Sequence, residues 1–267
     1  MVGVAHPQHL EAKEERSSMS SSVAVTRITH SCHLIEIGGQ RFLTDPWFSS
    51  TATYKPGEAI ALNLAHLPAL DGVLISHEHY DHCDLDTFVA YRDHDIPMIV
   101  PNTVGQMAVD HDFRNVTVLE PWESVKVGDV KVTAAPGKHG VYEITFILQG
   151  GSDTVYFAGD TMLIPELSEL PDRFGRIDVA LLPTNGLCIR PLDDMQVVMD
   201  AEEAAQLTAI LNPKLVLPHH YAFSSGWLGD RLLTKKDNDP RHFAEAAGRL
   251  APDTTVRIVE PGQLVRL

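Results

Sequence analysis

Hydrophobic residues in the N-terminal part of the chain fall into short runs that are separated by turn-forming residues. The runs at 23–29, 34–37 and 41–44 are rich in β-branched and aliphatic side chains, a pattern that predicts β-strands. Gly38 and Gly39 stand between the second and third runs, where a tight turn would join the two strands as a hairpin. The chain is therefore expected to open with antiparallel β-structure.

Strand-like and helix-like segments alternate along the rest of the chain. The apolar run 73–75 follows Asp71-Gly72 and predicts a buried strand, and Asp84 is a candidate N-cap for a helix that reaches about residue 92. The segments expected after it are a strand over 98–100, a helix over 103–110, strands over 130–135, 142–148, 154–158 and 179–182, a helix over 201–211, a strand over 215–217, a helix over 242–250 and a closing strand over 255–259. Hairpins together with β-α alternation indicate an α/β fold in which helices cover sheets.

The composition is that of an ordinary globular protein. Of the 267 residues, 44% are hydrophobic and 21% are charged, which is enough to build a substantial core. No Pro- or Ser-rich linker interrupts residues 23–267, so we expect them to form one domain. Residues 1–22 combine charges with a Ser-rich end and lack the apolar centre of a secretory signal, which predicts a disordered tail. Met19 directly precedes the first strand-like run and is an alternative translation start.

Charge and cysteine content narrow the range of partners. The net charge of -15 disfavours a nucleic-acid partner, and the absence of an apolar run of about 18 residues disfavours insertion into a membrane. The three cysteines (Cys32, Cys83 and Cys188) are widely spaced, which indicates neither a disulfide framework nor a zinc knuckle and fits a cytoplasmic location. We expect a small-molecule substrate, and the question of a homo-oligomer stays open.

A dense group of histidines and acidic residues follows the buried strand at 73–75. Residues 76–82 read Ser-His-Glu-His-Tyr-Asp-His. Residues two apart in extended backbone face the same side, so His77 and His79 can present both imidazoles to one cation. Asp81 and His82 lie beyond the strand end, where the chain can turn toward a second cation. Imidazole and carboxylate are ligands that zinc prefers, whereas histidine-rich solvated tracts, the alternative, seldom interleave aspartate at a strand end.

The spacing of this group distinguishes between families of metal site. The residue four positions after His77 is Asp81 and not a second histidine, which excludes the zincin helix motif. The sequence instead resembles the metallo-β-lactamase superfamily, whose hallmark His-x-His-x-Asp-His is matched at residues 77–82. The resemblance extends over about 23–267, where four more positions of the family pattern are filled, namely Asp45, His139, Asp160 and His220. His219 is the competing candidate for the last of these positions.

The resemblance implies a four-layer αβ/βα sandwich and a site for two divalent cations that activate water. Zinc is the expected metal, with manganese and iron as alternatives. The implied ligands are His77, His79 and His139 for one cation, Asp81, His82 and His220 for the other, and Asp160 for both. Two catalytic roles are implied as well: Asp81 orients the hydroxide, and Asp45 holds a ligand imidazole in the correct tautomer.

Within the superfamily, residues 29–31, 44–48 and 218–221 are most similar to the branch that contains L-ascorbate 6-phosphate lactonase and N-acylphosphatidylethanolamine phospholipase D. The resemblance thus implies a hydrolase acting on an ester, lactone or phosphodiester of a small molecule. Flavodiiron proteins carry glutamate at the position of His79, which disfavours di-iron oxygen chemistry. A catalytically silent metal-binding or regulatory module and a non-hydrolytic metal-dependent lyase are the alternatives.

Two segments, 47–60 and 222–239, are expected to flank the site. Each is interpreted either as a substrate-binding segment or as a solvated loop. Their candidate contacts are Trp47, Tyr54, Lys55, Trp227, Arg231, Lys235 and Lys236. His30 and Tyr221 lie near the motifs, and bracing of the first hairpin is the alternative role for His30.

Overall fold

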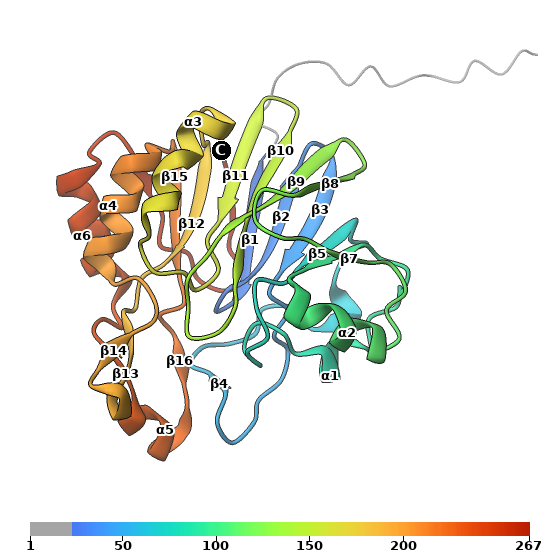
Figure 1. Ribbon diagram of the computed structural model, residues 1–267, viewed down its shortest axis with the longest axis horizontal. Helices are drawn as coiled ribbons and strands as arrows, with labels where there is room; N and C mark the ends of the chain where they lie inside the picture. The colour runs from blue at the N-terminus through green and yellow to red at the C-terminus, as the bar shows by residue number, and fades with distance from the viewer. Residues whose placement is uncertain (1–22) are drawn as a thin grey trace, which may run out of the picture.

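Two large β-sheets stacked face to face form the centre of the molecule, and helices cover their outer faces (Figure 1). The computed structural model describes residues 23–267, so the predictions of a disordered tail and of a start at Met19 lie outside the described residues. The four layers match the predicted α/β sandwich. No helix within 23–267 has the length and apolar character needed to cross a membrane.

The first sheet combines an antiparallel half with a parallel half. In spatial order its strands are β19 (Leu264–Arg266), β1 (Ala24–Thr29), β2 (Cys32–Ile37), β3 (Gln40–Thr44), β5 (Gly72–Leu74), β6 (Met98–Val100) and β7 (Val116–Val118). Strands β19 to β3 pair antiparallel, and β3, β5, β6 and β7 pair parallel. The helices α1 (Leu85–Phe88) and α2 (Asn102–Asp110) lie on its outer face.

The second sheet also has an antiparallel and a parallel half. Its spatial order is β18 (Thr255–Val256), β15 (Leu215–His219), β12 (Val179–Pro183), β11 (Asp153–Phe157), β10 (Ile144–Gly150), β9 (Val130–Pro136) and β8 (Ser124–Val127). Its outer face is covered by α3 (Leu170–Phe174), α4 (Ala201–Leu211) and α6 (Pro240–Leu250). The inner faces of both sheets bury one shared core, in which Ile35 and Phe42 of the first sheet belong with Phe146 and Leu181 of the second.

Several short elements gather at one end of the sandwich (Figure 1). They are the strands β13 (Leu187–Ile189), β14 (Met195–Gln196) and β17 (Leu233–Lys235), the pair β4 (Lys55–Pro56) and β16 (Phe223–Ser224), and the helix α5 (Gly226–Leu232). The sequence pattern did not predict these elements, nor did it predict β7, β8, β19 or α3. Strands of two or three residues are too short to display a period of two.

The predicted helix over 84–92 is shorter in the structure. Asp84 caps α1 as expected, because its carboxylate accepts a hydrogen bond from the Thr87 amide, but the helix ends at Phe88. The next turn is tighter, since the amide of Tyr91 donates to the carbonyl of Phe88. Leu85, Phe88 and Tyr91 are all buried, and their spacing of three suits this tighter winding.

Two predicted strands also differ. The strand predicted over 142–148 begins at Ile144, because Tyr142 is exposed and its hydroxyl donates to Glu120. The predicted closing strand over 255–259 has only two residues. The chain then crosses to the first sheet, where β19 pairs with β1. On the way, Val259 is buried and its carbonyl accepts a hydrogen bond from the Arg27 guanidinium.

Candidate metal centre

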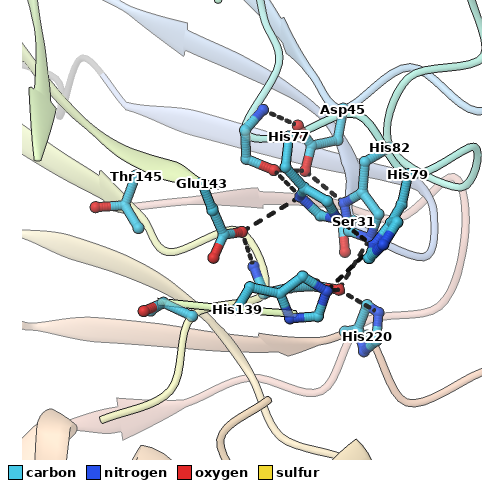
Figure 2. A network of polar contacts seen from close by, with 12 residues as sticks. Ser31, Asp45, His77, His79, His82, His139, Glu143, Thr145 and His220 are labelled. Carbon is cyan, nitrogen blue, oxygen red and sulfur yellow. Dashed lines mark hydrogen bonds and ion pairs between the residues drawn. The ribbon is translucent and has the colours of Figure 1, made fainter. Parts of the chain in front are cut away.

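The predicted ligands meet where the chain leaves the carboxyl ends of strands in both sheets. Residues 76–82 follow β5, and Asp45 follows β3, in the first sheet. The other three positions come from the second sheet, since His139 follows β9, Asp160 follows β11 and His220 follows β15. Carboxyl ends of neighbouring parallel strands share one sheet edge, so residues up to 175 positions apart in the sequence come together here (Figure 2).

Three imidazoles form a compact first group. His77 Nε2 lies 2.9 Å from His79 Nδ1, and His139 Nε2 lies 3.1 Å from the same Nδ1 atom. Ligands at zinc–nitrogen distances of 2.0–2.1 Å in tetrahedral geometry lie about 3.3 Å apart. His139 Nδ1 is 2.7 Å from the Val197 carbonyl, which leaves Nε2 facing the group. The structure thus brings together the three residues that were predicted to share one cation.

Asp160 lies between this first group and a second one. Its Oδ2 atom is 2.7 Å from His220 Nε2, 3.1 Å from His82 Nε2 and 4.0 Å from His139 Nε2. Asp81 Oδ2 is 3.8 Å from His82 Nε2. The side chains of Asp160, Asp81, His82 and His220 are all buried. The structure thus places Asp160 between the two groups and brings Asp81, His82 and His220 together in the second.

The carboxylate of Asp45 fixes the His82 ring. Asp45 Oδ2 lies 2.7 Å from His82 Nδ1 and accepts a hydrogen bond of 2.8 Å from the Ser76 hydroxyl, and Asp45 Oδ1 accepts one from the Ser76 amide. Burial alone would lower the pKa of His82, but Asp160 and the neighbouring aspartates raise it well above its usual value. The predicted role of Asp45, holding a ligand imidazole, fits this arrangement, which turns His82 Nε2 toward the other donors.

Glu143 is a site residue that sequence reasoning missed. It is buried immediately before β10, where its Oε1 atom accepts a 2.6 Å hydrogen bond from the Asp160 amide and lies 3.3 Å from His77 Nδ1. Burial raises the pKa of Glu143 well above its usual value. The carboxylate therefore connects a ligand of the first group with the shared Asp160. The available signal was a lone glutamate before the largely apolar run 144–148.

Gly159 allows Glu143 to approach this closely. Its φ is +53°, and a Cβ atom there would lie 2.5 Å from Glu143 Oε1 and 2.9 Å from Ser76 Cβ. A side chain at position 159 would therefore displace either the carboxylate or the strand end that carries the ligand histidines.

The two adjacent histidines at the end of β15, His219 and His220, point in different directions because of the backbone conformation. His219 turns inward, where its Nδ1 atom lies 3.0 Å from the Ser31 hydroxyl and its ring stacks on Phe157. His220 has φ of +61°, and its ring contacts the cluster through Asp160. The structure thus places His220, and not the competing His219, among the candidate ligands.

A cavity of about 280 Å³ opens directly over the cluster. His79, Asp81, His139, Asp160 and His220 form its floor. Its walls carry mostly apolar side chains from the short elements and the segments next to them, namely Tyr54, Leu187, Ile189, Val197, Phe223 and Leu233.

Of the flanking residues considered as substrate contacts, only Tyr54 lines this cavity. Trp47 is fully buried and packs edge-on against His30. The Lys235 ammonium donates to the Phe223 carbonyl, and Lys235 lines a different surface hollow. Trp227 is 74% exposed, with the Arg231 guanidinium 4.2 Å from the centre of its ring.

Comparison with known proteins places this architecture in a family. The model of the β-lactamase superfamily domain matches residues 40–221, which include all eight positions from Asp45 to His220 discussed above together with the competing His219. The chain belongs to this superfamily. It is also 26% identical over 242 residues to a UPF0173 metal-dependent hydrolase of Caldivirga maquilingensis, an alignment that covers 89% of this chain and 95% of the relative.

Solved structures show the same fold. Igni18, a metallo hydrolase from Ignicoccus hospitalis, superposes with a TM-score of 0.72 at 23% identity over 92% of this chain and 98% of that chain. CmlA, a diiron β-hydroxylase from Streptomyces venezuelae, gives a TM-score of 0.71 at 21% identity over 94% of this chain and 55% of that one. The predicted metallo-β-lactamase fold is confirmed, and so is the prediction of a metal-dependent hydrolase at the level of the family.

Proposed function

We propose that this protein hydrolyses an uncharged ester or lactone of a small molecule at a site for two divalent cations. The substrate class is inferred from the apolar cavity directly above the histidine and aspartate cluster. An apolar pocket that ends in a few convergent polar groups is the usual form of a small-molecule site. The metal-binding groups in its floor would lie beside the bond to be cleaved.

The residues present suit divalent cations. His77 Nε2 and His139 Nε2 both lie within about 3 Å of His79 Nδ1, and Asp160 joins these nitrogens to a second set of donors. Asp160 Oδ1 is buried without a hydrogen-bond partner, which is costly unless another group satisfies it. When bound, two such cations polarise a carbonyl oxygen and lower the pKa of a water molecule. Zinc is the proposed metal, with manganese and iron as the alternatives.

Residues of the chain itself would bind and orient the substrate. The walls formed by Leu187, Ile189 and Leu233 exclude water from the acyl portion. Tyr54 is the polar wall residue, and burial raises the pKa of its hydroxyl, so the phenol stays protonated at neutral pH. It can therefore donate a hydrogen bond to a substrate oxygen. Asp81 and Asp160, in the floor, can accept a proton or hydrogen bond from the attacking water.

An anionic substrate is a poorer fit to this cavity. None of the described residues that line it is lysine or arginine, and the nearby Lys235 ammonium is already engaged by a backbone carbonyl. For a phosphodiester or a phosphorylated lactone, the cations alone would have to compensate the negative charge, because the walls offer no basic side chain. Within the branch suggested by the sequence, this favours lactone or ester chemistry over phosphodiester cleavage.

The decisive experiment measures metal content and turnover on the same sample. Bound metal per chain is determined by mass spectrometry, and hydrolysis of an uncharged aryl ester, an aliphatic lactone and bis(p-nitrophenyl) phosphate is followed before and after chelation. Reconstitution with zinc, manganese and iron is tested separately. We expect two metals per chain, chelator-sensitive ester or lactone hydrolysis and little phosphodiesterase activity.

A matched pair of variants provides the control. His220→Gln removes a candidate ligand, whereas His242→Gln changes a largely exposed histidine on α6 that pairs with Asp237 and does not line the cavity. The first should lose metal and activity together and the second neither. Two metals without hydrolysis of any substrate would favour the alternatives, a metal-dependent lyase or a binding module. A protein that binds no metal under any reconstitution would refute the proposal.

A further inference from the structure

His30 lies beside the candidate metal centre but belongs to none of the motifs that predicted it. It occupies the turn between β1 and β2, and its side chain is fully buried. Its Nδ1 atom has no hydrogen-bond partner, and its Nε2 atom faces the Asp81 carboxylate at 3.3 Å. Buried polar atoms are rarely left unsatisfied in folded proteins, so the Nδ1 atom of this imidazole calls for an explanation.

The ring of His30 faces the second group of donors. His30 Nε2 lies 3.3 Å from Asp81 Oδ2, and the ring centroid is 4.3 Å from that of His220. One ligand atom from each of His30, Asp81, His82 and His220 lies within 4.8 Å of the other three. A separation of 3.3 Å equals the spacing expected of two neighbouring ligands around one cation at about 2.0–2.1 Å.

The surrounding structure holds His30 in this position. Its backbone adopts φ of +48°, and its amide donates a 2.8 Å hydrogen bond to Glu58, which also accepts one from the buried Arg27. The rings of Trp47 and Phe223 pack against the imidazole at 5.1 and 5.2 Å. A left-handed backbone conformation that is held, through Glu58, by a buried arginine is more typical of a functional residue than of one that only fills space.

We propose that His30 is an additional protein ligand of the second cation. This inference rests on the proposed two-cation site and extends it. The ring is suited to the role because its Nε2 atom faces Asp81 and its centroid lies 4.3 Å from that of His220, which places the imidazole beside the donors of that cation. The second cation would then have the donors His30, Asp81, His82 and His220 besides the shared Asp160.

The extra donor makes the two cation sites unequal. Three imidazoles and one shared carboxylate suit a four-coordinate cation, as in many zinc sites. Five protein donors suit a cation of higher coordination number, such as manganese or iron. The inference therefore predicts that the two sites differ in metal preference, with zinc favoured in the first and a metal of higher coordination number favoured in the second.

The test compares His30→Gln with His33→Gln. His33 is an equally buried histidine of the same hairpin, but its Nδ1 atom bonds the Ser31 carbonyl outside the cluster, so it controls for loss of a buried ring. Binding of Co²⁺ is titrated by visible absorption and metal analysis. We expect His30→Gln to weaken the second binding step at least tenfold, with the first unchanged, and to increase the d–d absorption as the coordination number falls.

A measurement on the wild-type protein covers the case in which His30→Gln does not fold. In Co²⁺-loaded protein labelled with ¹⁵N-histidine, the number of imidazoles with hyperfine-shifted NMR signals is counted. Six would support the inference, and five would overturn it. Unchanged binding steps and absorption in a folded His30→Gln variant would also overturn it while leaving the two-cation site intact, whereas failure of the wild-type protein to bind Co²⁺ would refute the two-cation site itself.

Discussion

The floor and the walls of the site are built in different ways. Floor residues sit at the ends of strands in the two large sheets, and the ligands His82 and His139 each have a second partner that orients the ring. Wall residues such as Leu187 and Leu233 belong to strands of three residues outside both sheets. The two large sheets thus fix where the candidate metal-binding groups lie, whereas the short peripheral elements shape the cavity that a substrate would enter.

Exposure separates the residues around the cluster from the helix α5, which lies next to the walls. His77, His82 and Asp45 are 0% exposed, so a change there disturbs packed surroundings on every side. In α5, next to the walls, Trp227 is 74% and Leu228 60% exposed. Substitutions in the floor should therefore affect folding and metal binding together, while substitutions in the walls should affect substrate binding alone. The following four predictions test this division.

The largest effect is expected for Gly159→Ala in the floor. The new Cβ would clash with Glu143 and Ser76, and we expect a loss of about 3 kcal/mol in the free energy of unfolding from overpacking and backbone strain. Gly151→Ala is the control, because Gly151 has a similar φ of +62° with no atom within 4 Å of the added Cβ. It should lose only about 1–2 kcal/mol, the cost of the backbone conformation. Equal losses in urea unfolding would show that the contact with Glu143 is unimportant.

Asp45→Asn should mainly weaken metal binding. An amide cannot provide the charge that holds His82 Nδ1 at 2.7 Å, and loss of such a supporting carboxylate typically costs about 10–100-fold in metal affinity. Asp71→Asn alters another aspartate that accepts a backbone hydrogen bond, from Arg41, and should bind metal like the wild type. Competition with a chromophoric chelator measures both affinities. The role assigned to Asp45 is wrong if the two variants bind equally well.

In the walls, Leu233→Ala should raise KM for an ester or lactone about tenfold, because removing apolar contact from a pocket costs about 1–3 kcal/mol. Metal content and the unfolding midpoint should hardly change. Leu228→Ala removes the same side chain from an exposed position in α5 outside the cavity lining and should leave KM unaltered. Steady-state kinetics of the two variants decide whether this wall contacts substrate.

The smallest effect is expected for Trp227→Ser. The side chain is mostly exposed, so the free energy of unfolding should change by about 0.5 kcal/mol or less, with kcat, KM and metal content as in the wild type. A large rise in KM would instead extend the substrate-binding wall to α5.

The same division explains what could be predicted from the sequence. His77, His79, Asp81 and His82 could be assigned from the residues themselves, because they are contiguous and follow a recognisable buried strand. His139, Asp160 and His220 are isolated in the sequence, so only the resemblance identified them. The boundaries of the long apolar strands were also largely predictable. Like the contiguous histidine and aspartate group, each of these strands is encoded by a pattern of neighbouring residues.

Glu143 and His30 were not predictable in this way. Their positions depend on how the two sheets stack and on a left-handed turn at residue 30, and neither leaves a repeating pattern in the sequence. The wall strand β13 pairs with β17, which lies about 45 residues further along the chain, and short runs cannot encode such a contact. Sequence reasoning was thus strongest for the floor and weakest for the walls.

The distribution of ligands along the chain has a consequence for protein synthesis. The first group is complete once residue 139 has left the ribosome, apart from the shared Asp160 that follows 21 residues later. The second group must wait for His220, which follows β15. The residues of the first candidate group are therefore synthesised well before those of the second, which is complete only after the parallel strands β11, β12 and β15 have been made.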